Sequence, residues 1–292
     1  MGKITTISAN TLFHFTSDIN NLIGILTNNF YPRYSLENYS AFWPKNMEKK
    51  LSYSNVAIPM VSFCDIPLSN IRNHINVYGR YAIGLTKEWG ERNNINPIMY
   101  ALDDSIYAKV IKSSLNNIDK CVQKLNTHRD RLYLNNPKHK KDKKDKLIDT
   151  FIYELLRIDN GLLDIMSYTK NYSGKFNRNG KKNKKVCFYD EREWRYIPDP
   201  RLLFKQQLPN YIPKEIYLDV MKRKEANDKL ERTECMLKFE PDDIRYIIVS
   251  KHDEILRMVD RIHEIKGSKY GPKGMKLLTT RIISMEQILQ DF

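Results

Sequence analysis

A long helical pattern, residues 104–168, interrupts a chain whose strand patterns lie on both sides of it. Apolar residues recur there at intervals of three and four, as at Leu147, Phe151, Leu155 and Ile158. Short β-favouring runs surround this stretch, at residues 56–66, 78–85, 97–102, 188–197, 214–220, 236–239 and 244–249. With no repeats and no low-complexity linker, the pattern predicts one α+β domain over residues 1–292, with a mixed or antiparallel sheet and a helical insert at 104–168.

The first strand candidate, Leu12–Thr16, alternates between apolar and polar residues. Phe13 and Phe15 face one side, and His14 and Thr16 face the other. Ser17 is suited to cap the amphipathic helix that follows, and residues 28–55 read as an ordered, aromatic-rich loop. His14 is either a binding residue or a structural histidine between two phenylalanines.

The run Phe188–Ile197 reads as a strand that places Glu191, Glu193 and Arg195 on one face. A carboxylate beside a ribose can stabilise the positive charge that develops at the anomeric carbon when a leaving group departs. If this strand and the Leu12–Thr16 strand share a sheet, the two carboxylates can meet His14 and Thr16. Charges at this spacing also occur on ordinary strands whose neighbours supply opposite charges.

Basic residues outnumber acidic ones by 49 to 35, which gives a net charge of +14 and favours a phosphate-bearing partner such as nucleic acid. Two Lys-rich segments, 138–146 and 174–185, are predicted to be basic loops. They are either solvated loops or contacts for a nucleic-acid backbone. The second segment is the stronger candidate because it adjoins the Glu193 strand, and its nucleic-acid-binding residues would be Lys181, Lys182, Lys184 and Lys185.

Several classes of function find no support in the sequence. The four cysteines are scattered without metal-ligand spacing, so no metal site is expected. No Gly-x-Ser-x-Gly turn, phosphate-binding loop or Gly-x-Gly-x-x-Gly motif occurs. No apolar run approaches the length that spans a bilayer, so no membrane partner is expected and a cytoplasmic location is predicted.

Five motifs together resemble the AbiGi family of bacterial abortive-infection proteins, and the resemblance spans most of residues 10–250. The motifs are Leu12–Thr16, Phe63–Ser69, Tyr78–Trp89, Asn96–Tyr100 and Asp190–Tyr196. The resemblance implies one half of a two-gene phage-resistance system, in which the AbiGi member is labelled the antitoxin. It therefore implies a cognate toxin or antitoxin protein as a partner.

A more distant resemblance is to ADP-ribosyltransferase-like folds, including DarT-type toxins that modify DNA. Such folds carry a His-x-Thr element on the first strand, matched here by His14 and Thr16, and a catalytic Glu on a late strand, matched by Glu193 with Glu191 before it. Their middle aromatic position fits Phe63, Tyr78 or Tyr81. Phe15 departs from the Gly that many such enzymes place between His and Thr.

Two functions follow as hypotheses. The first is a phage-defence ADP-ribosyltransferase that uses NAD as its substrate, without a metal, and modifies nucleic acid or protein. Glu193 and Glu191 would be catalytic in that enzyme, and the dinucleotide would be held by His14, Thr16, Tyr81 and Arg195. The alternative is a non-catalytic antitoxin or regulator that binds nucleic acid or a toxin partner through its basic surface.

Overall fold

The computed structural model describes residues 9–44, 54–135, 143–178, 181–231, 233–267 and 270–291. Within these ranges the strands are β1 (Thr11–Thr16), β2 (Arg33–Asn38), β3 (Asn55–Cys64), β4 (Tyr81–Thr86), β5 (Asn96–Pro97), β6 (Met99–Ala101), β7 (Thr169–Asn171), β8 (Ser173–Arg178), β9 (Lys181–Cys187), β10 (Glu193–Tyr196), β11 (Ile212–Pro213), β12 (Ile244–Val249) and β13 (Ile282–Ser284). The expected α+β class with a mixed sheet is confirmed.

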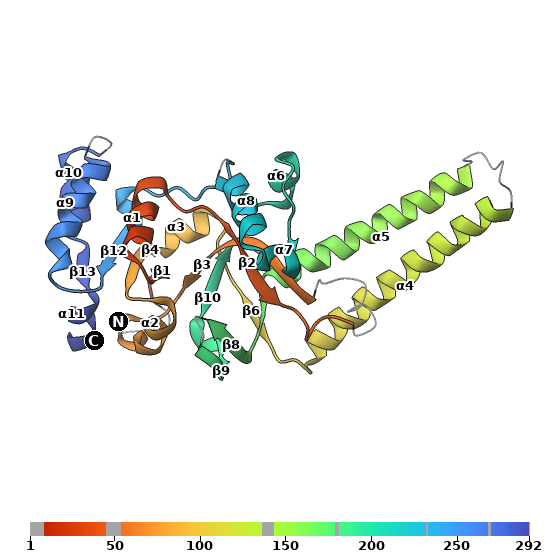
Figure 1. Cartoon of the computed structure of the whole chain (residues 1–292), viewed down its shortest axis with the longest axis horizontal. Helices are drawn as coiled ribbons and strands as arrows, with labels where there is room; N and C mark the ends of the chain where they lie inside the picture. The colour runs from red at the N-terminus through yellow and green to blue at the C-terminus, as the bar shows by residue number, and fades with distance from the viewer. Residues whose placement is uncertain are drawn as a thin grey trace, which may run out of the picture.

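The helices surround and extend this framework (Figure 1). They are α1 (Ile19–Asn28), α2 (Arg72–Tyr78), α3 (Lys87–Arg92), α4 (Ile106–Asn135), α5 (Lys143–Ser167), α6 (Pro200–Lys205), α7 (Lys214–Leu218), α8 (Val220–Glu231), α9 (Glu254–Lys266), α10 (Pro272–Thr279) and α11 (Met285–Asp291), with short 3-10 helices η2 (Leu68–Asn70), η3 (Phe188–Glu191) and η4 (Pro241–Asp243).

The main sheet, nine-stranded in the described part of the chain, has the order β13-β12-β4-β1-β3-β10-β5, and β2 and β11 also pair with β3. Only the β12–β13 pair is parallel among these pairings. Strand β3 is the longest strand and lies between β1 and β10. Strands from both ends of the sequence therefore share this sheet, with β1 near its centre and β12 and β13 at one edge.

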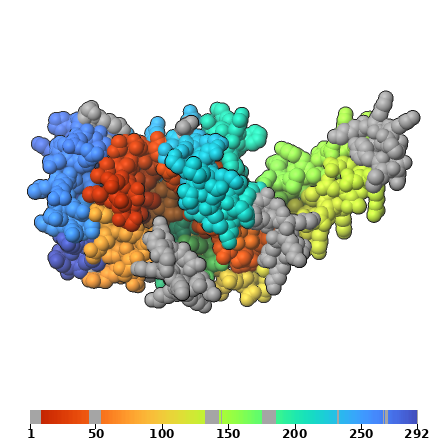
Figure 2. All heavy atoms as spheres, viewed as in Figure 1, coloured from red at the N-terminus to blue at the C-terminus, as the bar shows by residue number. Residues whose placement is uncertain are grey.

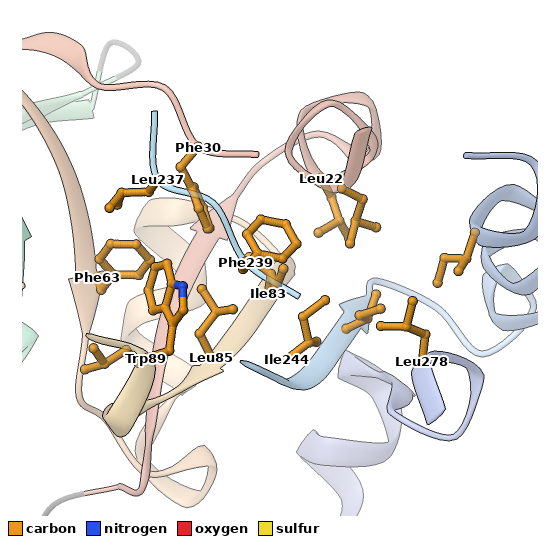
Figure 3. Packing of buried hydrophobic residues seen from close by; sticks show 14 of the residues in the cluster. Leu22, Phe30, Phe63, Ile83, Leu85, Trp89, Leu237, Phe239, Ile244 and Leu278 are labelled. Atoms are coloured by element: carbon orange, nitrogen blue, oxygen red, sulfur yellow. The ribbon is translucent and has the colours of Figure 1, made fainter. Parts of the chain in front are cut away.

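Apolar residues fill both faces of the sheet because the strands alternate their side chains. One face carries Leu12, Phe63 and Ile83 and is covered by α1, α3, α9 and α10 (Figure 3). The other face carries Phe13 and Cys64 and packs against α2 and α11. This three-layer packing fixes which strand residues can meet, since a side chain on one face cannot reach across the sheet.

The predicted helical segment forms two long helices, α4 and α5, which pack against each other (Figure 1). Arg129 of α4 pairs with Asp149 of α5 at 3.3 Å. At the base of the pair, Ile111, Leu115 and Met166 join a buried cluster that includes residues of β3. The far ends of the two helices extend away from the sheet (Figure 1).

Several local predictions are wrong. Asp18, rather than Ser17, caps α1 by accepting a hydrogen bond from the Asn20 N–H at 2.7 Å. Residues 33–38 form β2 where a loop was expected. Residues 214–218 form α7 rather than a strand, with Pro213 at the start and Ile216 packed in a buried cluster. In these places tertiary packing overrides the local pattern.

The basic segments also differ from the predicted loops. Residues 174–178 and 181–185 lie in β8 and β9, which pair antiparallel as a sheet separate from the main one. Residues 143–146 begin α5, and residues 138–142 lie outside the described part of the chain.

Candidate functional site

Strand β10 places Glu193 and Arg195 on one face of the sheet, as the sequence predicted, because residues two apart in a strand share a face. Glu193 lies opposite Cys64 of β3, and Arg195 lies opposite Ser62. Both charged side chains are nearly inaccessible to solvent, at 7% and 0% exposure. Charged groups this deep require partners of opposite charge or strong hydrogen bonds.

The Glu193 carboxylate has partners on both oxygens. Oε1 accepts from Ser62 Oγ at 2.8 Å and from Arg195 Nε at 2.7 Å. Oε2 accepts from Lys170 Nζ at 2.9 Å and from the second guanidinium nitrogen at 3.3 Å. These four hydrogen bonds match the number of lone-pair sites on a carboxylate.

The network extends from Glu193 in both directions. Arg195 pairs with Glu37 of β2 at 3.0 Å and donates to the Ser167 carbonyl at 2.7 Å. Lys170 of β7 also pairs with Glu191 at 2.6 Å. We name the five charged residues Glu37, Lys170, Glu191, Glu193 and Arg195 the ion cluster.

Glu191 reaches this ion cluster from outside the strand. Residues 188–191 form η3, and Arg192 follows in the left-handed region with φ 44°, so the predicted strand over 188–197 begins only at Glu193. The N–H groups of Phe188 and Tyr189 donate to the Tyr172 carbonyl, which holds the turn. The prediction that Glu191 belongs to the same strand face is wrong, although Lys170 still brings the two carboxylates together.

Electrostatics keep Glu193 and Lys170 charged. Burial alone would raise the pKa of Glu193, but the charges of Arg195 and Lys170 outweigh it and hold that pKa far below its ordinary value. Burial opposes the charge on Lys170 as well, yet the two glutamates raise its pKa well above the usual range. Tyr78 donates to Glu191 at 2.7 Å, and burial raises the pKa of this phenol. Glu193 is therefore an anion at neutral pH.

The candidate cofactor residues His14, Thr16 and Tyr81 lie on the opposite face of the sheet. Phe13 pairs with Cys64, which puts Phe13 and Glu193 on one side and His14 on the other. Thr16 pairs with Tyr81.

Each of these three side chains has its own contacts on the face opposite Glu193. The His14 ring packs edge-on to Phe63 at 5.8 Å, Thr16 accepts from Asn21 of α1, and Tyr81 donates to Glu254 of α9. The strands do share a sheet, as expected, but these three residues do not converge with Glu193, so the prediction that they meet it is wrong.

One connection runs through the sheet at Ser62. Its backbone carbonyl accepts from His14 Nδ1 at 2.8 Å, while its hydroxyl donates to Glu193. His14 is half-buried and held by this bond and by aromatic rings, as a structural histidine is.

The sequence gives no signal for three members of the network. Lys170 is a single lysine after a helix, Ser62 sits in an apolar strand, and Glu37 falls in a segment predicted to be a loop. Each joins Glu193 or Arg195 across a long sequence separation. Only the pairing of β2, β3 and β10, and the return of the chain from α5 into β7, places them together.

Other kinds of site are not evident in the residues that the structure describes. No three His, Cys, Asp or Glu side chains among them are grouped as a metal site. None of the described helices combines the length and the apolar character that a membrane crossing requires. Lys181, Lys182, Lys184 and Lys185 lie in β9, so the segment proposed to bind nucleic acid is part of a β-hairpin.

Comparison with known proteins gives a consistent answer. The sequence matches the family described as "Putative abortive phage resistance protein AbiGi, antitoxin" over residues 28–250. A relative, "Abortive phage resistance protein AbiGi" from Lactococcus lactis subsp. cremoris, is 29% identical over 289 residues, which cover 90% of this chain and 99% of the relative. No solved structure matches the chain. Because the family match covers most of the sequence, this protein belongs to the AbiGi family of abortive phage resistance proteins.

Proposed function

We propose that this protein is a non-catalytic antitoxin that restrains a toxin partner by binding it. The observation that carries the proposal is the state of the Glu193 carboxylate, whose two oxygens are held by Ser62, Lys170 and Arg195. A carboxylate that stabilises a reacting sugar must contact that sugar, whereas this one is buried and engaged with its own chain. The family description, which includes the word antitoxin, supports the same role.

In this proposal the ion cluster is structural. It ties β7, which follows α5, to β2 and β10 of the main sheet, and so holds the helical pair to the body. Breaking such a cluster leaves a buried charge without compensation, which is strongly unfavourable. In this proposal these charges are buried because they stabilise the fold, and they take no part in a reaction.

The direct test is co-expression of this chain with the second gene of its two-gene system. Cells that carry the toxic component alone are expected to stop growing, and cells that also express this chain are expected to recover. Affinity purification of the tagged chain should recover the toxic component in stoichiometric amount. Growth arrest caused by this chain alone would contradict the antitoxin role.

The ADP-ribosyltransferase hypothesis remains a second candidate because β1 and β10 belong to one sheet, where both pair with β3. Incubating purified protein with NAD, nucleic acid and cell extract tests it, with NAD consumption as the readout. The antitoxin proposal predicts no consumption. Turnover that is lost in Glu193→Gln, while the variant keeps the wild-type circular dichroism spectrum, would establish the enzyme instead.

Nucleic-acid binding is tested separately through its salt dependence, since each phosphate contact releases counterions. If the β9 lysines bind nucleic acid, replacing Lys181, Lys182, Lys184 and Lys185 by Gln should weaken binding and reduce its salt slope. If binding is unchanged, the β9 lysines do not form the nucleic-acid site, and any binding comes from the net charge of +14 spread over the rest of the surface.

A further inference from the structure

The α4–α5 pair presents a surface that the body of the protein does not cover. Figures 1 and 2 show the two helices extending well beyond the sheet, at the end opposite α9 and α10. The inner sides of both helices face each other, as the Arg129–Asp149 pair and the buried Leu115 show. What remains is the outer surface of a two-helix unit, where polar side chains are expected.

Helix α5 instead exposes a line of large apolar side chains, which we name the α5 stripe. Its members are Leu147, Phe151, Ile158 and Ile165, with exposures of 56%, 53%, 56% and 52%. Their spacings of four, seven and seven residues place them along one side of a helix. At 1.5 Å per residue the stripe is about 27 Å long. An ordered apolar line of this length is typical of a helix–helix contact rather than of a solvated surface.

The charges beside the stripe indicate what covers it. Glu154 and Arg157 are three residues apart near the middle of the stripe; they pair with each other at 3.2 Å within the helix, yet both stay exposed, at 51% and 68%. A second α5 running antiparallel would bring Glu154 of one chain near Arg157 of the other, and this contact would occur twice. A parallel copy would instead place like charges together, which is unfavourable.

The two ends of α5 show the same complementarity. Lys143 and Lys146 lie in its first turns, where the only acidic residue of the first turn, Asp145, is buried, and Asp159 and Asp164 lie in its later turns. An antiparallel copy sets the basic start of one helix toward the acidic end of the other. The dipoles of two antiparallel helices are also favourably aligned.

We infer that the α5 stripe is the interface of a homodimer, in which two copies of this chain pack α5 against α5 in antiparallel orientation. The two helical pairs then form a four-helix bundle, with the apolar side chains of both stripes interdigitated in its core. The two sheet bodies lie at opposite ends of this bundle. The inference concerns self-association and does not depend on whether the protein is an antitoxin.

The first experiment measures molar mass by light scattering and sedimentation over a range of concentrations, using the full chain. The wild type is expected to be a dimer, and the double variant Phe151→Glu/Ile158→Glu is expected to be a monomer. Tyr153→Glu is the matched control, since Tyr153 is 63% exposed and lies two residues from Phe151, on nearly the opposite side of α5. It should remain a dimer, and circular dichroism verifies that each variant is folded.

The second experiment tests the antiparallel orientation through charge. Glu154→Arg and Arg157→Glu should each weaken dimerisation by roughly tenfold, because each brings like charges together across the interface twice. The double exchange Glu154→Arg/Arg157→Glu should restore the wild-type dissociation constant. Because Glu154 and Arg157 also pair within their own helix, restoration supports the interface when circular dichroism shows that both single variants keep their helical content.

Three results would overturn the inference. One is a wild type that stays monomeric at every concentration. Another is a dimer that survives Phe151→Glu/Ile158→Glu. The third is a monomer that binds the toxic component of its system through the stripe, which would assign this surface to the toxin rather than to a second copy.

Discussion

Lys170 is the residue on which the ion cluster depends most, because its ammonium group contacts two carboxylates at once, Glu191 at 2.6 Å and Glu193 at 2.9 Å. Replacing it by Met keeps much of the side-chain volume but leaves those two anions close together without the cation between them. We expect Lys170→Met to lower the free energy of unfolding by about 3–5 kcal/mol. Urea denaturation followed by circular dichroism measures this change.

The control is Lys224→Met, which removes a lysine that pairs with Asp228 at 2.6 Å on the surface of α8. That lysine is 71% exposed, so its loss should change stability by less than about 1 kcal/mol. Similar losses for the two variants would show that the ion cluster stabilises the protein no more than a surface pair does.

His74 gives the fold a dependence on pH. Burial first, and then the positive charge of Lys170, lower its pKa from 6.5 to about 4, and its ring stacks on Tyr78 with centroids 4.4 Å apart. In the unfolded chain this histidine gains a proton below about pH 6.5, while in the folded chain it stays neutral until about pH 4. Stability is therefore complete above the unfolded pKa and is lost as the pH falls between these values.

The expected loss through His74 is about 1–2 kcal/mol between pH 7 and pH 5. Urea titrations at both pH values should show a smaller loss in His74→Gln than in the wild type. His128→Gln, which changes an exposed histidine of α4, should keep the wild-type dependence. An unchanged dependence in His74→Gln would mean that other groups set the acid sensitivity.

At the scale of single residues, the sequence could predict that Glu193 and Arg195 share one face because this follows from the period of a strand. It could not predict that Lys170 and Ser62 would saturate the carboxylate, since nothing local distinguishes them. It also could not decide the face on which His14 lies relative to Glu193. That relation is set by the register of β1 and β10 on β3, where Phe13 and Glu193 both align with Cys64.

At the scale of elements, long periodic patterns predict well and short ones do not. The repeat over 104–168 is a sound indication of α4 and α5 because many turns reinforce one another. The run 188–197 also alternates, but its first half is held as η3 by the Tyr172 carbonyl. A short run does not contain the information that a distant hydrogen-bond acceptor supplies.

The turn between α2 and β4 requires glycine. Gly79 has φ 109°, and a Cβ there would lie 2.3 Å from the backbone of Thr16 and Ser17. This close approach also ends α2 at Tyr78, whose hydroxyl reaches Glu191. We expect Gly79→Ala to destabilise the protein by about 2–4 kcal/mol, because the clash is with backbone and the conformation disfavours a side chain. Thermal and urea unfolding measure the effect.

Gly24 provides the opposite case within the same fold. It lies inside α1, and a Cβ there would meet nothing within 4 Å. Gly24→Ala should therefore stabilise the protein by about 0.5–1 kcal/mol. If the two substitutions changed the free energy of unfolding equally, the close contacts and the positive φ at Gly79 would not be the reason that this position needs glycine.

At the scale of the whole molecule, the protein divides its tasks between a sheet body and a helical extension. The base of the extension is built into the body, since Ala108, Ile111, Leu115 and Met166 pack with residues of β3. The outer part rests on contacts between the two helices, including the pair of Arg129 with Asp149. Stability of the body and association between copies should therefore be separable.

Replacing residues 123–155 by a short Gly-rich turn removes this outer part and retains the buried base. The shortened protein is expected to unfold cooperatively with a free energy within about 2 kcal/mol of the wild type, because the sheet and its three layers keep their packing. It should also be monomeric, since the deletion removes Leu147, Phe151 and Glu154. Sedimentation and urea denaturation on the same preparation measure both properties. A shortened chain that stays dimeric would place the association on the body, whereas one that fails to fold would show that the helical extension is part of the structural core.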